Sequence, residues 1–432
     1  MKRKIVVLIG CLLGATAFTQ EASAVPAFAR QMGMACSSCH FQHFPLLNSF
    51  GCAFKASGFT MIGMQTKVED ENLSIPSTLN FAGFATAGYS RVSNQPPGTS
   101  VGSFSTPNGG GELSLFFGGR VSENVGFLSE LAFPDSNSAG SAAKLVMTWD
   151  VAGTRTGLSI IANKTPAYSM ELLNTGAVET HKMVGDKGDP SVVNLESAGI
   201  HSNVFSAAQY LGTGAPAHGG SFVSSGSMGF VNIGKYNLNP VGGSSSQSSE
   251  MSTTYARAAY IFELAGWDTA VGVQNFSGHV GNSNNPVGLF DPAAPTPAGY
   301  TDSKATIIDG QLQGEIAGKL VGVYASCGRA PISSTSNLYN IHNETTKRSC
   351  NIAGELGIIP HKATAQLAFR SARNGDLAGR NTDNAVMLGG TYELSQNVEL
   401  SLTHTMNSGN AYDAAAPAVG KTQTTLLLEA LF

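Results

Sequence analysis

The sequence predicts an all-β protein: a closed, antiparallel barrel of sixteen strands with a small helical domain at its N-terminus. Two observations on residues 77–432 lead to this prediction. Segments of about ten residues alternate apolar side chains with small or polar ones, as a wall between lipid and a polar interior requires. The connections tend to alternate between tight turns and long loops rich in Gly, Ser, Asn and Pro, which is typical of barrels in the bacterial outer membrane.

Composition agrees with a barrel and argues against other classes. Charged residues make up 12% of the 432-residue chain, against about 25% in soluble domains, and 51 residues are glycine. Past the N-terminus no run of about 18 apolar residues occurs, so we expect no membrane-spanning helix. The net charge is -4 and there is no basic cluster, so we expect no nucleic-acid partner.

Residues 1–24 are predicted to be an export signal. Three basic residues near the start precede an apolar stretch that ends at Phe18, and Ala22-Ser23-Ala24 forms a small-residue cleavage site. A lipoprotein box ending at Cys11 is an alternative, but cleavage there leaves an apolar core of only about six residues. Export places the mature chain outside the cytoplasm, where cysteines can oxidise.

The stretch Cys36-Ser37-Ser38-Cys39-His40 carries the clearest chemical signal in the chain. Two thiols separated by two residues and followed by an imidazole are what covalent haem attachment needs. Cys36 and Cys39 would form thioethers with the vinyl groups, and His40 would be the proximal iron ligand. We therefore predict one covalently bound haem c.

Other interpretations of this cysteine pair remain open. Cys36, Cys39, His43 and Cys52 would supply four zinc ligands, but their spacing fits no common structural zinc pattern. A redox-active pair is expected near a strand in a βαβ unit, which this stretch lacks. A simple disulfide between residues three apart leaves the adjacent histidine unexplained.

Residues 25–68 are predicted to form the haem domain. Pro45 can open a helix and Gly58 can close it. Four apolar residues between them recur at helical spacing: Leu46, Leu47, Phe50 and Phe54. About 45 residues is too few for an independent core, so we expect the domain to lean on a larger part of the chain. Residues 69–76, which are acidic and end in proline, are interpreted as a linker.

The second axial ligand of the iron is expected beyond this helix. Met61 and Met64 are the candidates, because His43 lies too close to the motif to reach the opposite haem face. Thioether ligation would raise the reduction potential. Ordinary packing is the alternative for each methionine, and Met34, Lys55 or an open position also remain.

The alternation of side chains locates the barrel strands. In the last segment Leu426 and Leu428 take one face while Thr425 and Glu429 take the other. The sixteen predicted segments are 79–90, 112–121, 124–134, 143–150, 156–164, 199–211, 220–235, 251–264, 269–279, 304–314, 318–327, 349–358, 362–373, 384–394, 397–407 and 422–432. The predicted long loops are 91–111, 165–198, 280–303, 328–348 and 408–421.

Two details agree with this topology. Phe432 ends the chain in phase with its strand, like the terminal aromatic of outer-membrane barrels. Cys327 and Cys350 lie at the two bases of one long loop, where antiparallel neighbours come close, so we predict a disulfide between them. A soluble β-sandwich is the alternative for this half, but it does not explain the difference between short and long connections.

The N-terminal region resembles a known family. Residues 25–31 (Val-Pro-Ala-Phe-Ala-Arg-Gln), the motif at 36–40, residues 41–51 and Phe54-Lys55, followed by one porin-sized barrel, look like the fused monohaem cytochrome-porin family of outer-membrane proteins, best known as iron oxidases. The resemblance is specific over residues 25–60 and architectural over the rest.

The resemblance implies a haem plug at the periplasmic mouth of the barrel and one-electron oxidation of Fe(II) at the cell surface. By it Cys36, Cys39 and His40 carry over as haem residues. Cys52 stands where we expect arginine in this family, which adds a thiol beside the haem and puts that family contact in doubt.

Two functions are consistent with the sequence. The first is electron transfer in the outer membrane, with Fe(II):cytochrome c oxidoreductase activity implied by the resemblance. Fe(II) or another external redox donor would supply electrons, a periplasmic cytochrome c would accept them, and the reverse flow is equally compatible. The second is a diffusion porin that carries a haem plug. Lumen-phase Glu130, Arg257, Asp309 and Arg370 are polar and inward, but no cluster has ligand spacing for an external iron site.

Overall fold

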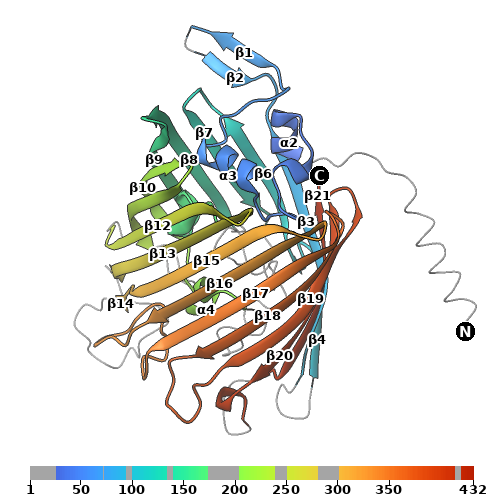
Figure 1. Ribbon diagram of the computed structural model, residues 1–432. Helices are drawn as coiled ribbons and strands as arrows, with labels where there is room; N and C mark the ends of the chain where they lie inside the picture. The colour runs from blue at the N-terminus through green and yellow to red at the C-terminus, as the bar shows by residue number, and fades with distance from the viewer. Residues whose placement is uncertain are drawn as a thin grey trace, which may run out of the picture.

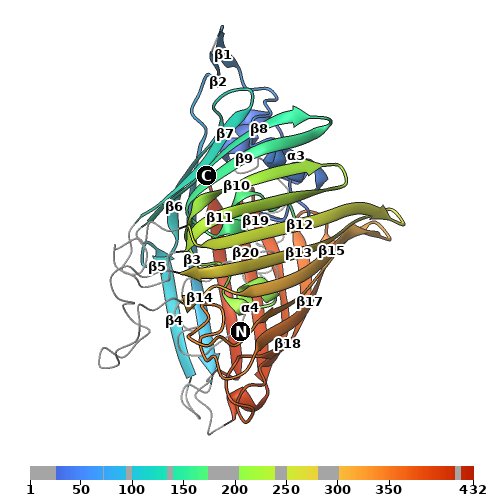
Figure 2. The same cartoon turned by 90° about the vertical axis from the view of Figure 1, so that its left-hand side faces the viewer.

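The structure, a computed structural model, describes residues 26–71, 73–93, 100–133, 140–173, 204–238, 251–280, 301–413 and 420–432. It is a closed antiparallel barrel with a small N-terminal domain at one end, which confirms the predicted fold class (Figures 1 and 2). The predicted export signal lies outside the described residues. No helix in the described ranges is both long enough and apolar enough to cross a bilayer.

The barrel wall is built from consecutive antiparallel strands. These are β3 (Phe81–Ser93), β4 (Ser100–Pro107), β5 (Gly110–Gly111), β6 (Leu113–Arg120), β7 (Val125–Ala132), β8 (Gly140–Val151), β9 (Thr154–Lys164), β10 (Ala217–Gly226), β11 (Gly229–Leu238), β12 (Thr253–Leu264), β13 (Trp267–Val280), β14 (Thr301–Asp302), β15 (Ala305–Ile316), β16 (Lys319–Ala330), β17 (Lys347–Ile359), β18 (Ala363–Arg373), β19 (Asn384–Ser395), β20 (Val398–Ser408) and β21 (Thr422–Leu431). β21 pairs with β3 and β9 pairs with β10, so the barrel has no open edge between them.

β4 and β6 together fill one position of the wall. β4 pairs with residues 88–93 of β3, and β6 pairs with residues 81–85 of the same strand. The bulge at residues 108–112 separates the two halves. Counted this way, with β14 as a short extension beside β13, the described strands fill sixteen positions.

The predicted number of strands is confirmed, but two of the predicted segments are wrong in ways that cancel. Residues 204–211, within the predicted segment 199–211, contain no strand and include helix α4 (Ala207–Leu211). The predicted segment 220–235 is two strands, β10 and β11, joined at Gly226 and Gly229. The alternation continues through this short turn, so sequence alone gives no sign of the reversal. β4 also occupies part of the predicted loop 91–111.

Short turns and long connections lie on opposite rims. The turn residues Ala152-Gly153, Ala265-Gly266 and Ala317-Gly318 all have positive φ, as two-residue hairpin turns with the twist of the strands require. We call the end that carries these turns the short-turn rim. Phe432 closes the wall at this rim, where its backbone exchanges hydrogen bonds of 2.6 and 3.0 Å with Gly83.

The two faces of the wall differ as predicted. Outward side chains form an apolar band that is exposed in the isolated chain: Leu158, Ile160, Phe222, Val271, Ile308, Ile352, Phe369, Leu388, Leu402 and Leu426. Inward side chains of the same strands are polar or aromatic and buried, among them Gln274, Asp309, Arg370 and Thr405. An apolar belt around a polar interior is the arrangement that a lipid-embedded barrel requires.

The lumen is partly filled by the segment between β9 and β10. Residues 165–173, which include the 3₁₀ turn η3 (Pro166–Ser169), and residues 204–216, which include α4, fold back inside the wall (Figures 1 and 2). Every residue of α4 is buried, and the Ala207 amide donates to the inward Ser326 hydroxyl at 2.8 Å. We call residues 165–173 and 204–216 the lumen segment.

The N-terminal domain closes the short-turn rim. It contains α2 (Pro26–Met32), the turn η2 (Cys36–Ser38) and α3 (Ser49–Ala56). α2 is not predicted by the sequence patterns, and α3 begins after the predicted opening at Pro45 because the Asn48 side chain caps it, accepting from the Gly51 amide at 3.0 Å. Gly58, with a φ of 71°, follows the helix as predicted.

Residues 69–76, interpreted as a linker, are instead mostly a hairpin. β1 (Lys67–Asp70) pairs with β2 (Leu73–Pro76) and projects beyond the short-turn rim (Figure 1). The hairpin is acidic and largely exposed, so its composition resembles a linker although its backbone is paired.

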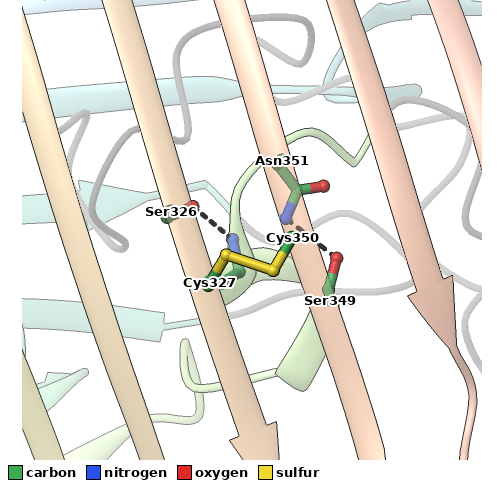
Figure 3. Close-up of a disulfide and its surroundings, with 6 residues drawn as sticks. Ser326, Cys327, Ser349, Cys350 and Asn351 are labelled. Atoms are coloured by element: carbon green, nitrogen blue, oxygen red, sulfur yellow. Dashed lines mark hydrogen bonds between the residues drawn. A yellow bond between two sulfur atoms is a disulfide. The ribbon is translucent and has the colours of Figure 1, made fainter.

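Cys327 and Cys350 form a disulfide where the sequence predicts one. They face each other directly in the register of β16 and β17, and the sulfurs are bonded on the outer face of the wall (Figure 3). The neighbouring Ser326, Ser349 and Asn351 are buried on the lumen side. The bond closes the base of the loop at residues 331–346.

Candidate functional site

The motif residues lie on one face of a single helical turn. The amides of Cys39 and His40 both donate to the Cys36 carbonyl, at 3.0 and 2.9 Å. Residues three and four apart on such a turn are neighbours, so the two thiols and the imidazole share one side. This is the local reason for the C-x-x-C-H spacing.

The start of α3 holds this turn in place. Asn48 donates from its side-chain amide to the carbonyls of Ser37 and Ser38, and its backbone amide donates to the Cys39 carbonyl at 3.0 Å. Gly51 lets the helix approach, since a Cβ there would lie 2.2 Å from the Cys39 carbonyl oxygen. A side chain at position 51 would therefore displace the motif.

The orientation of His40 is set by the backbone. Its Nδ1 lies 3.1 Å from the Leu46 carbonyl oxygen, which can only accept, so Nδ1 carries the proton. The lone pair is then on Nε2. Metal-binding histidines commonly donate their other ring N–H in this way, which fixes the ring and increases the basicity of the ligating nitrogen.

A cavity adjoins the motif on the inner side of the barrel wall. Its lining includes Cys36, His40 and Phe44 from the N-terminal domain, and His361, Lys362, Glu393, Val398, Glu399, Glu429 and Leu431 from β17–β21. The Cys36 thiol donates to Asn397 Oδ1 at 3.4 Å, across the boundary between the domain and the wall. The Cys36 thiol and the preset His40 imidazole line this cavity, and Cys39 follows on the same turn, which fits the attachment of a c-type haem.

Three glutamates form a row along this cavity. Glu393 is directly opposite Glu399 in the strand register, and Glu399 is directly opposite Glu429. Like charges in directly paired positions destabilise a sheet, so their retention beside the motif is a feature of the site rather than of the wall. Burial, with Glu393 as a further cause, raises the pKa of the Cys36 thiol to about 12.

The other interpretations of the cysteine pair do not fit this geometry. His43 Nε2 is 2.7 Å from Glu355 Oε1, and the Cys52 thiol donates to the Leu172 carbonyl at 3.0 Å, so the proposed zinc ligands point to different partners. Burial also raises the pKa of Cys39, whereas redox-active cysteines have lowered values. In the described ranges, no group of three His, Cys, Asp or Glu side chains is arranged to hold a metal ion.

The domain is attached to the wall on several sides of the mouth. Arg30 donates to the Phe81 carbonyl at 2.7 Å, Ser49 donates to Asp268 at 2.7 Å, and the buried His43–Glu355 pair reaches β17. Gly126 in β7 has no room for a side chain, because a Cβ would lie 1.8 Å from the Gly58 carbonyl oxygen. Domain and barrel are therefore packed as one body.

The N-terminal domain also contacts the lumen segment. Phe41 and Leu46 belong to one apolar cluster with Phe205, and Cys52 and Ala56 of α3 pack around Leu172. The two insertions, one from each rim, meet inside the barrel. Burial lowers the pKa of Lys55. The negative charge of Glu171, in the lumen segment, acts in the opposite direction and raises it.

Met61 and Met64 are not beside the motif cavity. Met61 packs against the cluster of Phe54 and Phe59, and it lines a second cavity with Arg120 and Arg155. The Met64 side chain is 81% exposed. The structure therefore places neither methionine among the residues that line the cavity with His40.

The four polar lumen residues that the sequence offers as an iron site are engaged in ion pairs. Arg257 bonds both Asp309, at 2.6 Å, and Glu171 of the lumen segment, at 2.9 Å. Arg370 bonds Asp383, and Lys164 bonds Glu130 at 2.7 Å. The Arg257 and Arg370 pairs are buried and the Lys164–Glu130 pair is partly buried, so these side chains are bonded to one another within the fold.

Sequence reasoning missed three residues of the site: His361, Glu355 and Asn397. All three lie in β17 or in short turns, far along the chain from the motif. Their partners are set by where the domain docks on the barrel. No periodicity or spacing in the sequence carries that information.

Comparisons with known proteins agree with the barrel. No protein-family model matches the chain, and no curated protein matches it. Salmonella typhi OmpF in complex with daunomycin matches with a TM-score of 0.50 and 12% identity, covering 85% of this chain and 100% of that chain.

Two further solved structures match less well. OmpT of Vibrio cholerae has a TM-score of 0.48 and 9% identity, covering 85% of this chain and 100% of that one. An anion-selective porin from Comamonas acidovorans has a TM-score of 0.45 and 11% identity, covering 82% and 99%. The match to OmpF, at 12% identity, establishes the fold and nothing finer, so this chain has the fold of an outer-membrane porin.

Proposed function

We propose that this protein transfers electrons across the outer membrane through one covalently bound haem c. Cys36 and Cys39 hold the haem through thioethers, and His40 Nε2 binds its iron. An external donor, Fe(II) in the first instance, supplies electrons, and a periplasmic cytochrome c accepts them. As in the fused cytochrome-porin family that residues 25–60 resemble, the short-turn rim faces the periplasm.

One observation carries the proposal. The C-x-x-C-H turn sits inside the mouth of a closed barrel, with the His40 ring fixed by the Leu46 carbonyl and with Cys36 and His40 lining a cavity. Passive diffusion does not require a c-type attachment motif. The bound group would supply a one-electron couple at this point.

The chain's own residues give this couple a defined position. The lipid-facing band of such a barrel is about 25 Å tall and insulates the two sides of the membrane. The N-terminal domain enters the mouth and meets the lumen segment, which shortens the insulated gap. The glutamate row at residues 393, 399 and 429 makes this mouth negative, which would favour the approach of a basic electron acceptor.

Rapid mixing with Fe(II) tests the proposal. The purified protein in detergent should carry the mass of one haem after denaturation and should be reduced by Fe(II) within the stopped-flow time range. Cys36→Ser combined with Cys39→Ser should lose the covalent mass, whereas Cys52→Ser, which removes a thiol outside the motif, should keep it. Wild-type protein without the added mass would end the proposal, and reduction by dithionite but not by Fe(II) would replace iron with another donor.

A diffusion porin is the second candidate, favoured by the fold itself. In the described ranges, residues 165–173 and 204–216 and the N-terminal domain all occupy the lumen. Planar-bilayer recordings distinguish the two functions. Wide, steady conductance by the haem-loaded protein would favour the porin, and conductance that appears only after deletion of residues 26–66 would favour a plugged electron carrier.

A further inference from the structure

We infer that His361, in the turn between β17 and β18, is the second axial ligand of the haem iron. This inference rests on the proposed function, because it assigns a residue toward the group that Cys36, Cys39 and His40 would hold. It differs from the sequence-based expectation, which places the ligand at Met61 or Met64. The ligand would come from the barrel wall and not from the haem domain.

His361 lies at the cavity beside the motif. The cavity beside the motif is lined by three histidines, His40, His43 and His361. His40 and His43 belong to the N-terminal domain, whereas His361 enters from the wall on the other side of the domain boundary. Cys36 and His40 both line this cavity, so a group bonded to the motif would extend into it, and His361 would approach that group from the wall.

The imidazole rings of His40, His43 and His361 differ in their hydrogen bonding. His40 bonds the Leu46 carbonyl, and His43 is held between Glu355 Oε1 at 2.7 Å and the Phe44 carbonyl at 2.7 Å. The His361 imidazole makes no hydrogen bond or ion pair to any of the described residues. Its backbone, by contrast, is constrained, with a φ of 53° in a turn closed by the Lys362 amide and the Ile359 carbonyl at 3.0 Å. The same left-handed conformation occurs at Ala152, Ala265 and Ala317 in other turns of this rim, so it belongs to the turn and fixes where the His361 side chain begins.

Met61 and Met64, the ligands predicted from the sequence, do not line this cavity. Met61 packs between aromatic rings and faces the cavity of Arg120 and Arg155, so it lies on another side of the domain. Met64 is solvent-exposed, with its amide bonded to the Met32 carbonyl. Met64 packs against Gly33, and neither methionine lines the cavity that His40 and His361 share.

An iron ligand from the wall would change how the N-terminal domain is held in the barrel. A ligand from the wall would join the domain to the barrel through the iron, in addition to the His43–Glu355 pair and the Cys36–Asn397 contact. Attachment of haem would then lock the plug into the mouth. Two imidazole ligands would also give a lower reduction potential than an imidazole and a thioether.

Spectroscopy of purified, haem-loaded variants tests the inference. His361→Ala should keep the covalent haem mass but lose the low-spin electron paramagnetic resonance signal of the wild type, and the reduced form should bind carbon monoxide. Added imidazole should restore the low-spin signal. His342→Ala, at the opposite rim, is the matched control and should behave like wild type, as should Met61→Leu.

A second variant guards against a folding failure. His361→Met should stay low-spin and show a raised reduction potential. The barrel of this variant should resist unfolding in cold detergent as well as the wild-type barrel does. In His361→Ala the N-terminal domain of the haem-loaded protein should be cut faster by protease than in wild type, while the barrel stays intact.

The outcomes test the assignment of His361 and the proposed function separately. An unchanged low-spin signal in His361→Ala, or a loss of that signal in Met61→Leu, overturns the assignment of His361 and leaves the proposed function standing. Wild-type protein without covalent haem overturns both. Loss and imidazole rescue in His361→Ala alone supports the inference.

Discussion

The buried ion pairs around Arg257 give the sharpest test of how the lumen is held. Arg257 bonds Glu171 through Nε and Nη2, at 2.9 and 3.3 Å, and Asp309 through Nη1 and Nη2, at 2.6 and 2.9 Å. The side chains of all three residues are at most 1% exposed. Arg257→Met would therefore leave two carboxylates buried without their cation.

The magnitude follows from this geometry. Removing one partner of a buried ion pair costs about 3–5 kcal/mol. Lys55 also acts on Glu171 through its charge, so we expect a loss at the lower end of this range, about 3 kcal/mol, from the free energy of unfolding. Since Glu171 belongs to the lumen segment, the loss should also loosen that segment and the contact between Leu172 and Cys52.

Urea titration in detergent, followed by tryptophan fluorescence, measures the first effect, and bilayer conductance measures the second. Adding Glu171→Gln and Asp309→Asn to Arg257→Met removes the unpaired charges and should recover more than half of the loss. Arg348→Met, at an exposed position on β17, is the matched control and should change stability by less than about 0.5 kcal/mol. A loss below about 1 kcal/mol in Arg257→Met, or a triple variant no better than the single one, would refute the reasoning.

Three further predictions concern the plug and the wall. His43→Phe leaves Glu355 buried without its partner, so protease should release the N-terminal domain faster, and equal rates in wild type and variant would contradict the role of this pair. Cys327→Ser with Cys350→Ser opens a disulfide between residues 23 apart and should lower the free energy of unfolding by about 3 kcal/mol relative to oxidised wild type, measured by urea titration. Reduced wild type should match the variant, and a variant as stable as oxidised wild type would contradict this prediction. Burial raises the pKa of Cys52 to about 12, above its ordinary value of 9.0. The neutral thiol therefore favours the docked domain below pH 9, and this contribution is lost as the pH rises from 9 toward 12. Maleimide labelling of Cys52 should accelerate over that range beyond the increase seen in the urea-unfolded protein, and a parallel increase in both states would exclude linkage.

The sequence predicted much of the barrel because its information is local. In a strand with a period of two, neighbouring side chains face lipid and lumen in turn. This alternation is visible in Leu426, Leu428 and Glu429 of a single strand, whatever its partner strands are. The same property explains the error at residues 220–235. A hairpin turn between Gly226 and Gly229 keeps the alternation in phase, so two strands read as one.

The motif was equally local. Cys36, Cys39 and His40 fall within one helical turn, so their spacing alone places them on one face. The disulfide of Cys327 and Cys350 could be expected because a single loop separates two antiparallel neighbours. Each of these predictions needed only residues close in sequence or paired by one hairpin.

The tertiary structure decided everything that depends on docking. Only the packing of the N-terminal domain in the short-turn rim brings His43 to Glu355, Cys36 to Asn397 and the motif cavity to His361. Only the folding of residues 165–173 and 204–216 into the lumen pairs Arg257 with Glu171. These contacts join residues from 86 to 361 positions apart, and they form because buried charges and apolar surfaces require partners that no local pattern specifies.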